Sequence, residues 1–436
     1  MEKISAGVFL CFAYEKTYFT IFHECHSFIV YIPYKWKKWN VYRMEVYVMK
    51  RIIYLIVMSL LLTIVYVPSG FAREEGVELV KNVKSAILIE RDTGTVLFEK
   101  NSHEQLPPAS MTKVMTMLLI MEALDQGKLS MDEKIRTSEY AASMGGSQIF
   151  LEPGEELTTK QMLEGIAIAS GNDASVAMAE RLAGSEEEFV KLMNKKAKEL
   201  GLKNTEFKSA TGLPGKSDYS TAHDMAMMAK ELLKYEDITK FTSVYESYLR
   251  ENTDKKFWLV NTNRLVRFYP GVDGLKTGFT NEAKYCLTAT AEKDGMRVIA
   301  VVFGAPTSKA RNAEVTKMLD YAFSQYKTHP IFKRNVTLGK VAVSKGEKKR
   351  VEAVTSEPIS LLTKKGEGIE KIKQTVMLDK NVKAPLEKGD KIGVLKLKQD
   401  GKTLVVSPLI AKEASNKASW WILYKRSMGM FTKAGQ

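Results

Sequence analysis

Hydrophobic and polar positions along this chain follow two different periods, and the changes of period divide it into segments. Two alternating runs, 83–90 and 95–99, flank the turn 91–94 and predict a β-hairpin. Apolar positions then recur at helical spacing in several stretches, 114–121, 157–169, 174–182, 189–200 and 221–233. Strand-like patterns return at 274–280, 285–291 and 297–303, and a last helix is predicted over 312–326.

This order of elements predicts the fold class. A strand pair, a set of helices, a second strand set and a final helix indicate an α+β fold over residues 73–330. We expect one antiparallel sheet built from both ends of that segment, with a helical subdomain beside it. Short alternating segments between Gly- and Lys-rich turns predict a small all-β domain over 335–410, which we interpret as a spacer.

The beginning of the chain carries an export signal. Met49-Lys50-Arg51 is followed by an apolar run over 52–67 and by small residues ending at Ala72, so residues 49–72 are predicted to be a signal peptide. Residues 1–48 are aromatic and lack a clear period. We interpret them as a spurious upstream extension with Met49 as the true start, and an uncleaved N-terminal anchor is the alternative. Either interpretation places the bulk of the chain outside the cytoplasm.

The end of the chain, 411–436, predicts an amphipathic helix. At helical spacing one face gathers aromatic and apolar side chains, namely Trp420, Trp421, Tyr424, Met428 and Phe431. The segment is too short and too charged to span a bilayer. We therefore expect an interfacial helix that anchors the protein peripherally to the outer face of the cytoplasmic membrane. Docking of the same helix on the β-rich domain is the alternative.

Composition and charge narrow the classes of binding partner that the protein can have. The chain has 65 Lys and Arg against 51 Asp and Glu, and residues 73–436 retain 57 against 47, an excess of +10. Such a balance suits an anionic wall polymer, an anionic membrane or nucleic acid, and export argues against nucleic acid. Cys286 is the only cysteine beyond residue 72 and lies in an apolar strand pattern, which favours a core position. The histidines lack metal-ligand spacing, so no metal or other cofactor is expected.

The segment Pro107-Pro108-Ala109-Ser110-Met111-Thr112-Lys113 carries the first candidate chemistry. Two prolines can precede a helix but not sit inside one, so Ser110 and Lys113 should lie one turn apart on the first turn of an apolar helix. A lysine held among apolar neighbours has a lowered pKa and can take the serine proton. Taken alone, most Ser-x-x-Lys matches are ordinary helix starts with a solvated lysine.

Two further motifs make the combination specific. Ser170-Gly171-Asn172 lies at a predicted helix junction, and Lys276-Thr277-Gly278 lies on a predicted strand. With all three motifs in this order, the sequence resembles the penicillin-binding protein and serine β-lactamase superfamily. It is most similar to the low-molecular-mass D-alanyl-D-alanine carboxypeptidases, in particular the sporulation-associated ones of Bacillus-like bacteria. The resemblance covers nearly all of residues 49–436.

This resemblance implies roles for particular residues. Ser110 would be the acylated nucleophile and Lys113 its general base, while Ser170 and Asn172 would carry a proton relay and a contact to the substrate amide. The opposite wall would comprise Lys276, Thr277, Gly278 and Phe279, with the N–H groups of Ser110 and Phe279 forming the oxyanion hole. Arg311 would lie near the terminal carboxylate of the substrate. An exposed arginine at a helix start is the alternative for Arg311.

The resemblance also implies the reaction, removal of the terminal D-alanine from peptidoglycan stem pentapeptides, with β-lactams acylating the same serine. A β-lactamase is disfavoured because the middle motif is Ser-Gly-Asn and we find no Glu-x-x-Leu-Asn stretch. A DD-endopeptidase or transpeptidase remains open on the motifs alone. A non-catalytic wall-binding protein would not need all three motifs.

Overall fold

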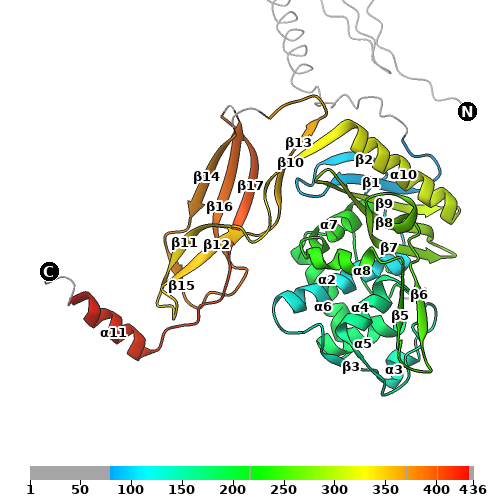
Figure 1. Cartoon of the computed structure of the whole chain (residues 1–436), viewed down its shortest axis with the longest axis horizontal. Coiled ribbons are helices and arrows are strands. Elements are labelled where there is room, and N and C mark those ends of the chain that lie inside the picture. Colours follow the sequence, from blue (N-terminus) through cyan, green and yellow to red (C-terminus); the bar gives the residue numbers. More distant parts are fainter. Residues whose placement is uncertain (1–78, 216–217, 370–371, 400, 432–436) are drawn as a thin grey trace, which may run out of the picture. The chain divides into compact units, whose positions relative to one another are not determined.

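The computed structural model describes residues 79–215, 218–369, 372–399 and 401–431 (Figure 1). The predicted upstream extension, 1–48, and the predicted signal peptide, 49–72, lie outside the described residues. Everything that follows concerns the described part of the chain.

The first domain is built on an antiparallel sheet whose strands come from both ends of the segment, which confirms the predicted α+β fold. Its order is β2-β1-β9-β8-β7. The bounds are β1 Ser85–Glu90, β2 Val96–Lys100, β7 Val272–Thr280, β8 Lys284–Lys293 and β9 Met296–Ala305. Within this sheet β1 pairs with β9, so that Ile87 lies opposite Val301. β7 is an edge strand, which leaves one side of its backbone free of sheet partners.

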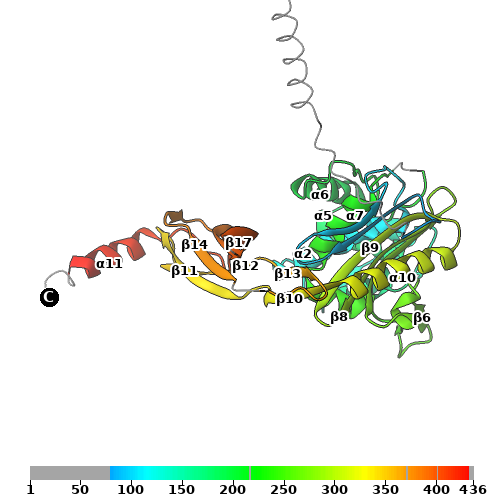
Figure 2. The ribbon, with the colours of Figure 1, turned by 90° about the horizontal axis from the view of Figure 1, so that it is seen from above.

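Alternating side chains give this sheet two apolar faces. Ile87 and Ile89 of β1 pack into the core of the helical subdomain, whereas Ala86 and Leu88 pack into a second core with α10 (Ser308–Gln325). In Figure 2, α7 (Ala222–Leu232) and α10 lie on opposite sides of β9. Both faces are therefore buried, which explains the continuous apolar run of β9.

The helical subdomain stands between β2 and β7 in the sequence. Besides α7 it contains η1 Ala109–Thr112, α2 Lys113–Asp125, α3 Glu139–Ala142, α4 Thr159–Ala167, α5 Asn172–Ala183, α6 Glu186–Glu199, η2 Glu236–Ile238, α8 Thr239–Thr242 and α9 Leu265–Phe268. Two short strand pairs accompany them, β3 Lys134–Arg136 with β4 Glu156–Thr158, and β5 Glu246–Leu249 with β6 Phe257–Val260. Thr221 caps α7 by accepting a hydrogen bond from the Asp224 N–H.

The second domain is all-β, as expected. Its larger sheet has the order β14-β16-β17-β12-β11-β15, and β10 pairs with β13. The bounds are β10 Tyr326–Phe332, β11 Thr337–Ser344, β12 Arg350–Thr355, β13 Ile359–Lys364, β14 Lys373–Leu378, β15 Val382–Lys383, β16 Lys391–Gln399 and β17 Lys402–Ala411. We expected the boundary between the two domains at residue 330, and this position falls inside β10. That strand pairs with β13 rather than continuing α10.

The C-terminal helix is shorter than the predicted segment 411–436. β17 extends to Ala411, Ser415 pairs with Leu386 of the β-rich domain, and α11 spans Trp420–Phe431. Trp420 is 73% exposed and Trp421 is 54% exposed. No helix within the described ranges is long and apolar enough to cross a membrane.

Candidate active site

Ser110 lies in η1, a 3₁₀ turn that leads directly into α2. From the sequence we expected Ser110 in the first turn of the α-helix itself. The tighter 3₁₀ turn follows from Pro107 and Pro108, because their missing N–H groups and fixed φ angles suit a helix entry rather than a helix interior. Gly278 of β7 packs on this turn, since a Cβ atom there would lie 2.7 Å from the Pro108 carbonyl oxygen. The Lys-Thr-Gly strand is thus seated directly against the turn that carries Ser110.

Lys113 begins α2 and its side chain is fully buried. Its Nζ lies 3.2 Å from Ser110 Oγ, 2.6 Å from Asn172 Oδ1 and 2.9 Å from the Thr211 carbonyl oxygen. Burial and the positive charge of Lys276 hold the Lys113 pKa well below its ordinary value, against the opposing effect of Asp173. The predicted pairing of Ser110 with a desolvated lysine is therefore present in the structure.

The Ser-Gly-Asn segment joins α4 to α5, and the side chain of its Asn172 contacts Lys113. Ser170 is 3% exposed with φ of +65°, and its Oγ has no hydrogen-bond partner among the described residues. Asn172 accepts from Lys113 through Oδ1 and donates from Nδ2 to the Gly145 carbonyl at 2.7 Å. Asn172 consequently orients Lys113, and its Nδ2 retains a second hydrogen for a further acceptor.

Asp173 fixes the loop beside this wall. Its buried carboxylate accepts hydrogen bonds from the N–H groups of Ile149 and Leu151. The same loop supplies the carbonyls of Gly145 and Ser147 that bond Asn172. A carboxylate that meets only backbone donors pins the loop against α5.

β7 forms the opposite wall with two buried polar side chains. Thr277 Oγ1 donates to Thr262 Oγ1 at 2.7 Å, and Lys276 Nζ donates to the Thr277 carbonyl at 3.3 Å. Burial, with the charge of Arg311 as a further cause, lowers the Lys276 pKa to about 7. The protonated form of Lys276 carries the charge. At or below neutral pH this wall therefore contains a cation that is shielded from solvent.

Phe279 and Tyr285 form the rim of this wall. Phe279 is 50% exposed, and its ring centroid lies 4.5 Å from that of Tyr285. They occupy directly paired positions of β7 and β8, so the two rings stand side by side at the end of the edge strand.

Arg311 is buried near the N-terminus of α10, 5% exposed, which excludes the alternative of an exposed helix-start arginine. Its Nε and Nη2 donate to Asn312 Oδ1 at 3.0 and 2.9 Å. Burial lowers the Arg311 pKa to about 10, and it forms no ion pair with any described carboxylate. A buried guanidinium without an acidic partner is suited to bind an anion that arrives from outside.

Cys286 lies on β8, opposite Gly278 of β7, and is fully buried, as its apolar setting predicts. Its Sγ contacts the Ala283 carbonyl oxygen at 3.4 Å, and burial raises the pKa of the thiol to about 11. The thiol is therefore a packing group at neutral pH.

Three residues that help to position the site were not identified from the sequence. They are Thr211, Asp173 and Thr262. Thr211 acts through its main-chain carbonyl, which leaves no trace in residue type. Asp173 directly follows the Ser-Gly-Asn motif, and a carboxylate in the first turn of a helix can be read as an ordinary cap. Thr262 reaches Thr277 only because Asn261 and Asn263 tie the segment after β6 to backbone carbonyls of Thr242 and Gly274.

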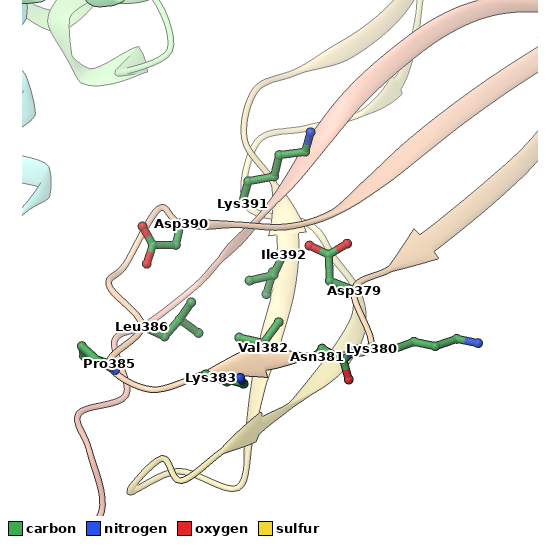
Figure 3. Close-up of a pocket in the computed structure, with 10 residues that line it drawn as sticks. All are labelled: Asp379, Lys380, Asn381, Val382, Lys383, Pro385, Leu386, Asp390, Lys391 and Ile392. Atoms are coloured by element: carbon green, nitrogen blue, oxygen red, sulfur yellow. The ribbon is translucent and has the colours of Figure 1, made fainter.

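A cavity of about 600 Å³ lies away from these residues, in the β-rich domain (Figure 3). The side chains of Lys380 and Lys391 extend away from Val382 and Ile392. Because its charged groups do not converge, this cavity lacks the arrangement that orients a small ligand.

The comparisons with known proteins agree with this geometry. Residues 75–307 match the D-alanyl-D-alanine carboxypeptidase family, and residues 326–417 match the C-terminal domain of penicillin-binding protein 5. The chain belongs to the family of D-alanyl-D-alanine carboxypeptidases, serine hydrolases that act on peptidoglycan and bind penicillin. Its substrate lies in the cell wall, so the enzyme is exported.

Individual relatives place the chain within this family. It is 65% identical over 388 residues to the D-alanyl-D-alanine carboxypeptidase DacF of Bacillus subtilis, covering 88% of this chain and 100% of the relative. It is 35% identical to DacC of Escherichia coli, over 80% of this chain and 88% of the relative. The crystal structure of penicillin-binding protein 5 from Haemophilus influenzae superposes with a TM-score of 0.59 at 30% identity, covering 78% of this chain and all of that one.

Proposed function

We propose that Ser110 is the nucleophile of a D-Ala-D-Ala carboxypeptidase and that Lys113 is its general base. The observation that carries this proposal is the contact between a fully buried Lys113 and Ser110 Oγ, with Nζ and Oγ 3.2 Å apart. A neutral amine at this position accepts the hydroxyl proton as Oγ attacks the carbonyl carbon between the two D-alanines. The bond to the terminal D-alanine then breaks, and an acyl-enzyme remains on Ser110.

Ser170 completes the proton path in this proposal. Its Oγ is buried, lacks a partner among the described residues and is held in a left-handed backbone conformation. A hydroxyl without a fixed partner can hand a proton to the departing amine of D-alanine. Water then hydrolyses the acyl-enzyme and regenerates Ser110, which divides one difficult displacement into two easier ones.

The opposite wall recognises the end of the substrate. A D-Ala-D-Ala peptide ends in a carboxylate, and Arg311, Lys276 and Thr277 supply two cations and a hydroxyl for it. The free edge of β7 offers backbone groups along which an extended peptide can lie, with Phe279 at the rim. We propose the N–H groups of Ser110 and Phe279 as the oxyanion hole, and Gly278 as the residue that lets β7 approach η1.

Release of D-alanine tests the assignment of the base. We expect the wild-type enzyme to free D-alanine from a peptide ending in D-Ala-D-Ala, with Lys113→Ala reduced about 10³-fold or more at neutral pH. Mass spectrometry of muropeptides after incubation shows whether the stem peptides alone are shortened, as a carboxypeptidase requires, or cross-links are also cut. Lys113→Ala that works at the wild-type rate would remove the base from the mechanism.

We also propose that α11 holds the exported enzyme at the outer face of the cytoplasmic membrane. Trp420, Trp421 and Tyr424 are exposed and stack on one another, which suits the headgroup region of a bilayer. Arg426 instead donates to the carbonyls of Gly346 and Glu347, so this part of the helix also contacts the β-rich domain. A role in wall trimming during sporulation stays a prediction from the family resemblance.

A further inference from the structure

The segment 209–212 contacts α2 and η1 through main-chain atoms. Its Thr211 carbonyl accepts a hydrogen bond from Lys113 Nζ at 2.9 Å, and Thr211 is 1% exposed. The preceding carbonyl, that of Ala210, accepts from Thr116 Oγ1 at 2.7 Å. Lys113 and Thr116 stand three residues apart on α2, so two successive carbonyls bind two successive donors on one helix face.

Two contacts from outside and one internal hydrogen bond fix the position of this segment. Glu186 of α6 accepts the Ala210 N–H at 3.0 Å, and Ser209 Oγ accepts the Gly212 N–H at 2.9 Å. Gly212 has φ of +73°, and a Cβ atom there would lie 1.9 Å from the Ala109 carbonyl oxygen of η1. Only glycine allows the segment to approach the turn of Ser110 this closely.

The hydrogen-bonding capacity of a neutral amine gives this arrangement its consequence. Such an amine has two N–H donors and one lone pair, and the carbonyl oxygens of Asn172 and Thr211 can only accept. Both hydrogens of Lys113 are therefore engaged, at 2.6 and 2.9 Å. The third oxygen neighbour is Ser110 Oγ, which carries the proton to be removed. The lone pair has one remaining direction, toward that proton.

We propose that the Thr211 carbonyl, held in place by Gly212 and by the bond of Thr116 to Ala210, is a positioning group that aims the lone pair of Lys113 at the hydroxyl of Ser110. When the Ser110 O–H bond breaks and the new N–H bond forms, all three hydrogens of the ammonium meet the same three oxygens. The heavy atoms need not move during this proton transfer. Such preorganisation lowers the barrier to the reaction. The inference rests on Lys113 being the base.

Two matched pairs of variants test it. Gly212→Ala displaces Thr211, whereas Gly201→Ala has nearly the same backbone strain, φ of +72°, with nothing within 4 Å of the new Cβ atom. Thr116→Val removes the donor to Ala210, and Thr116→Ser restores it. The measurement is the rate of acylation by a labelled penicillin across pH, with the melting temperature recorded for each variant.

We expect Gly212→Ala to acylate about 10- to 100-fold more slowly than Gly201→Ala, and Thr116→Val about 3- to 10-fold more slowly than Thr116→Ser. In Gly212→Ala and Thr116→Val the acid limb of the pH profile of acylation should also move to lower pH. The Thr211 carbonyl stabilises the ammonium form of Lys113 more than the amine, so displacing this carbonyl lowers the Lys113 pKa. Lys276 on β7 and Asp173 on α5, the charged groups that act on Lys113, are unchanged in these variants. A purely structural role would lower the melting temperature and leave the limb where it is.

The outcomes separate this inference from the assignment of the base. If Gly212→Ala and Thr116→Val both keep the rate and the acid limb of their controls while Lys113→Ala is inactive, the Thr211 carbonyl does not position the lysine. If Lys113→Ala itself acylates normally, the base assignment fails instead. Should Gly212→Ala not fold, the Thr116 pair decides alone.

Discussion

At the scale of single residues, the site holds two buried lysines that have different hydrogen-bond partners. Lys113 meets three oxygens at hydrogen-bonding distance, whereas Lys276 has the Thr277 carbonyl at 3.3 Å as its hydrogen-bond partner. In the mechanism that we propose, Lys113 is thereby aimed at one proton, and Lys276 supplies charge. Both lysines are kept in a setting that disfavours their ionised form, which is a cost to folding at neutral pH.

That cost is measurable for Lys276. Its pKa of about 7 in the folded state lies below the value of 10.5 for a free lysine, so the unfolded chain binds the extra proton between these two pH values. We expect Lys276→Met to raise the free energy of unfolding at pH 7 by about 1–3 kcal/mol and to slow acylation. Denaturant unfolding should show the gain largest at or below pH 7 and shrinking toward pH 10.5. A variant less stable than wild type at pH 7 would contradict the assignment of a buried, poorly solvated amine.

The sequence predicted side-chain chemistry better than main-chain chemistry. Ser110, Lys113 and Asn172 were found because their residue types and spacing carry the signal, and the structure brings them together. The Thr211 carbonyl could not be found in this way, because every residue has one. The burial of Arg311 likewise depends on how α10 packs on the sheet, which residue type alone does not show.

At the scale of elements, the site depends on a loop that is hydrogen-bonded to the first turn of a helix. Asp173 in the first turn of α5 holds residues 149–151, and Arg250 donates to the carbonyls of Ile149 and Phe150 from the other side. Arg250 is itself fixed by an ion pair with Glu155. The loop beside Asn172 is therefore held by hydrogen bonds from both sides.

Replacing Asp173 tests this dependence. In Asp173→Asn one carboxylate oxygen becomes an NH₂ group that faces the backbone N–H donors of the loop. We expect a loss of about 1–3 kcal/mol in stability and slower acylation, because Asn172 loses the fixed carbonyls that orient it. Thermal unfolding and penicillin acylation check the two parts. A variant with wild-type acylation would show that the loop needs no anchor at α5.

The sequence located most elements of the first domain and the pairing of β1 with β2, but not the order of the five strands in the sheet. The β5–β6 hairpin escaped notice because its strands are short, and its site-facing end at Thr262 is set by asparagine side chains rather than by an apolar period. The last helix was predicted to begin at residue 411, whereas α11 begins at Trp420. The pairing of Ser415 with Leu386 holds the preceding segment against the β-rich domain.

At the scale of the whole molecule, the chain combines a catalytic domain, an all-β domain and a helix with exposed aromatic residues. A chain ending at Ala418 removes α11 but retains the pairing of Ser415 and the bond from the Ala418 N–H to Lys345. We expect this shortened enzyme, expressed from Met49, to leave the membrane fraction and to keep its penicillin acylation rate within about twofold, because no site residue is changed. Fractionation and labelling check both points. Persistent membrane association would show that the anchor lies elsewhere.

Peptide mapping after reaction with a labelled penicillin tests the central claim most directly. The protein should gain one covalent adduct, and the modified peptide should carry it on Ser110, with no adduct in Ser110→Ala. The buried contact between Lys113 and Ser110 predicts this result. An adduct on a different residue, or equal labelling of Ser110→Ala, would contradict the account.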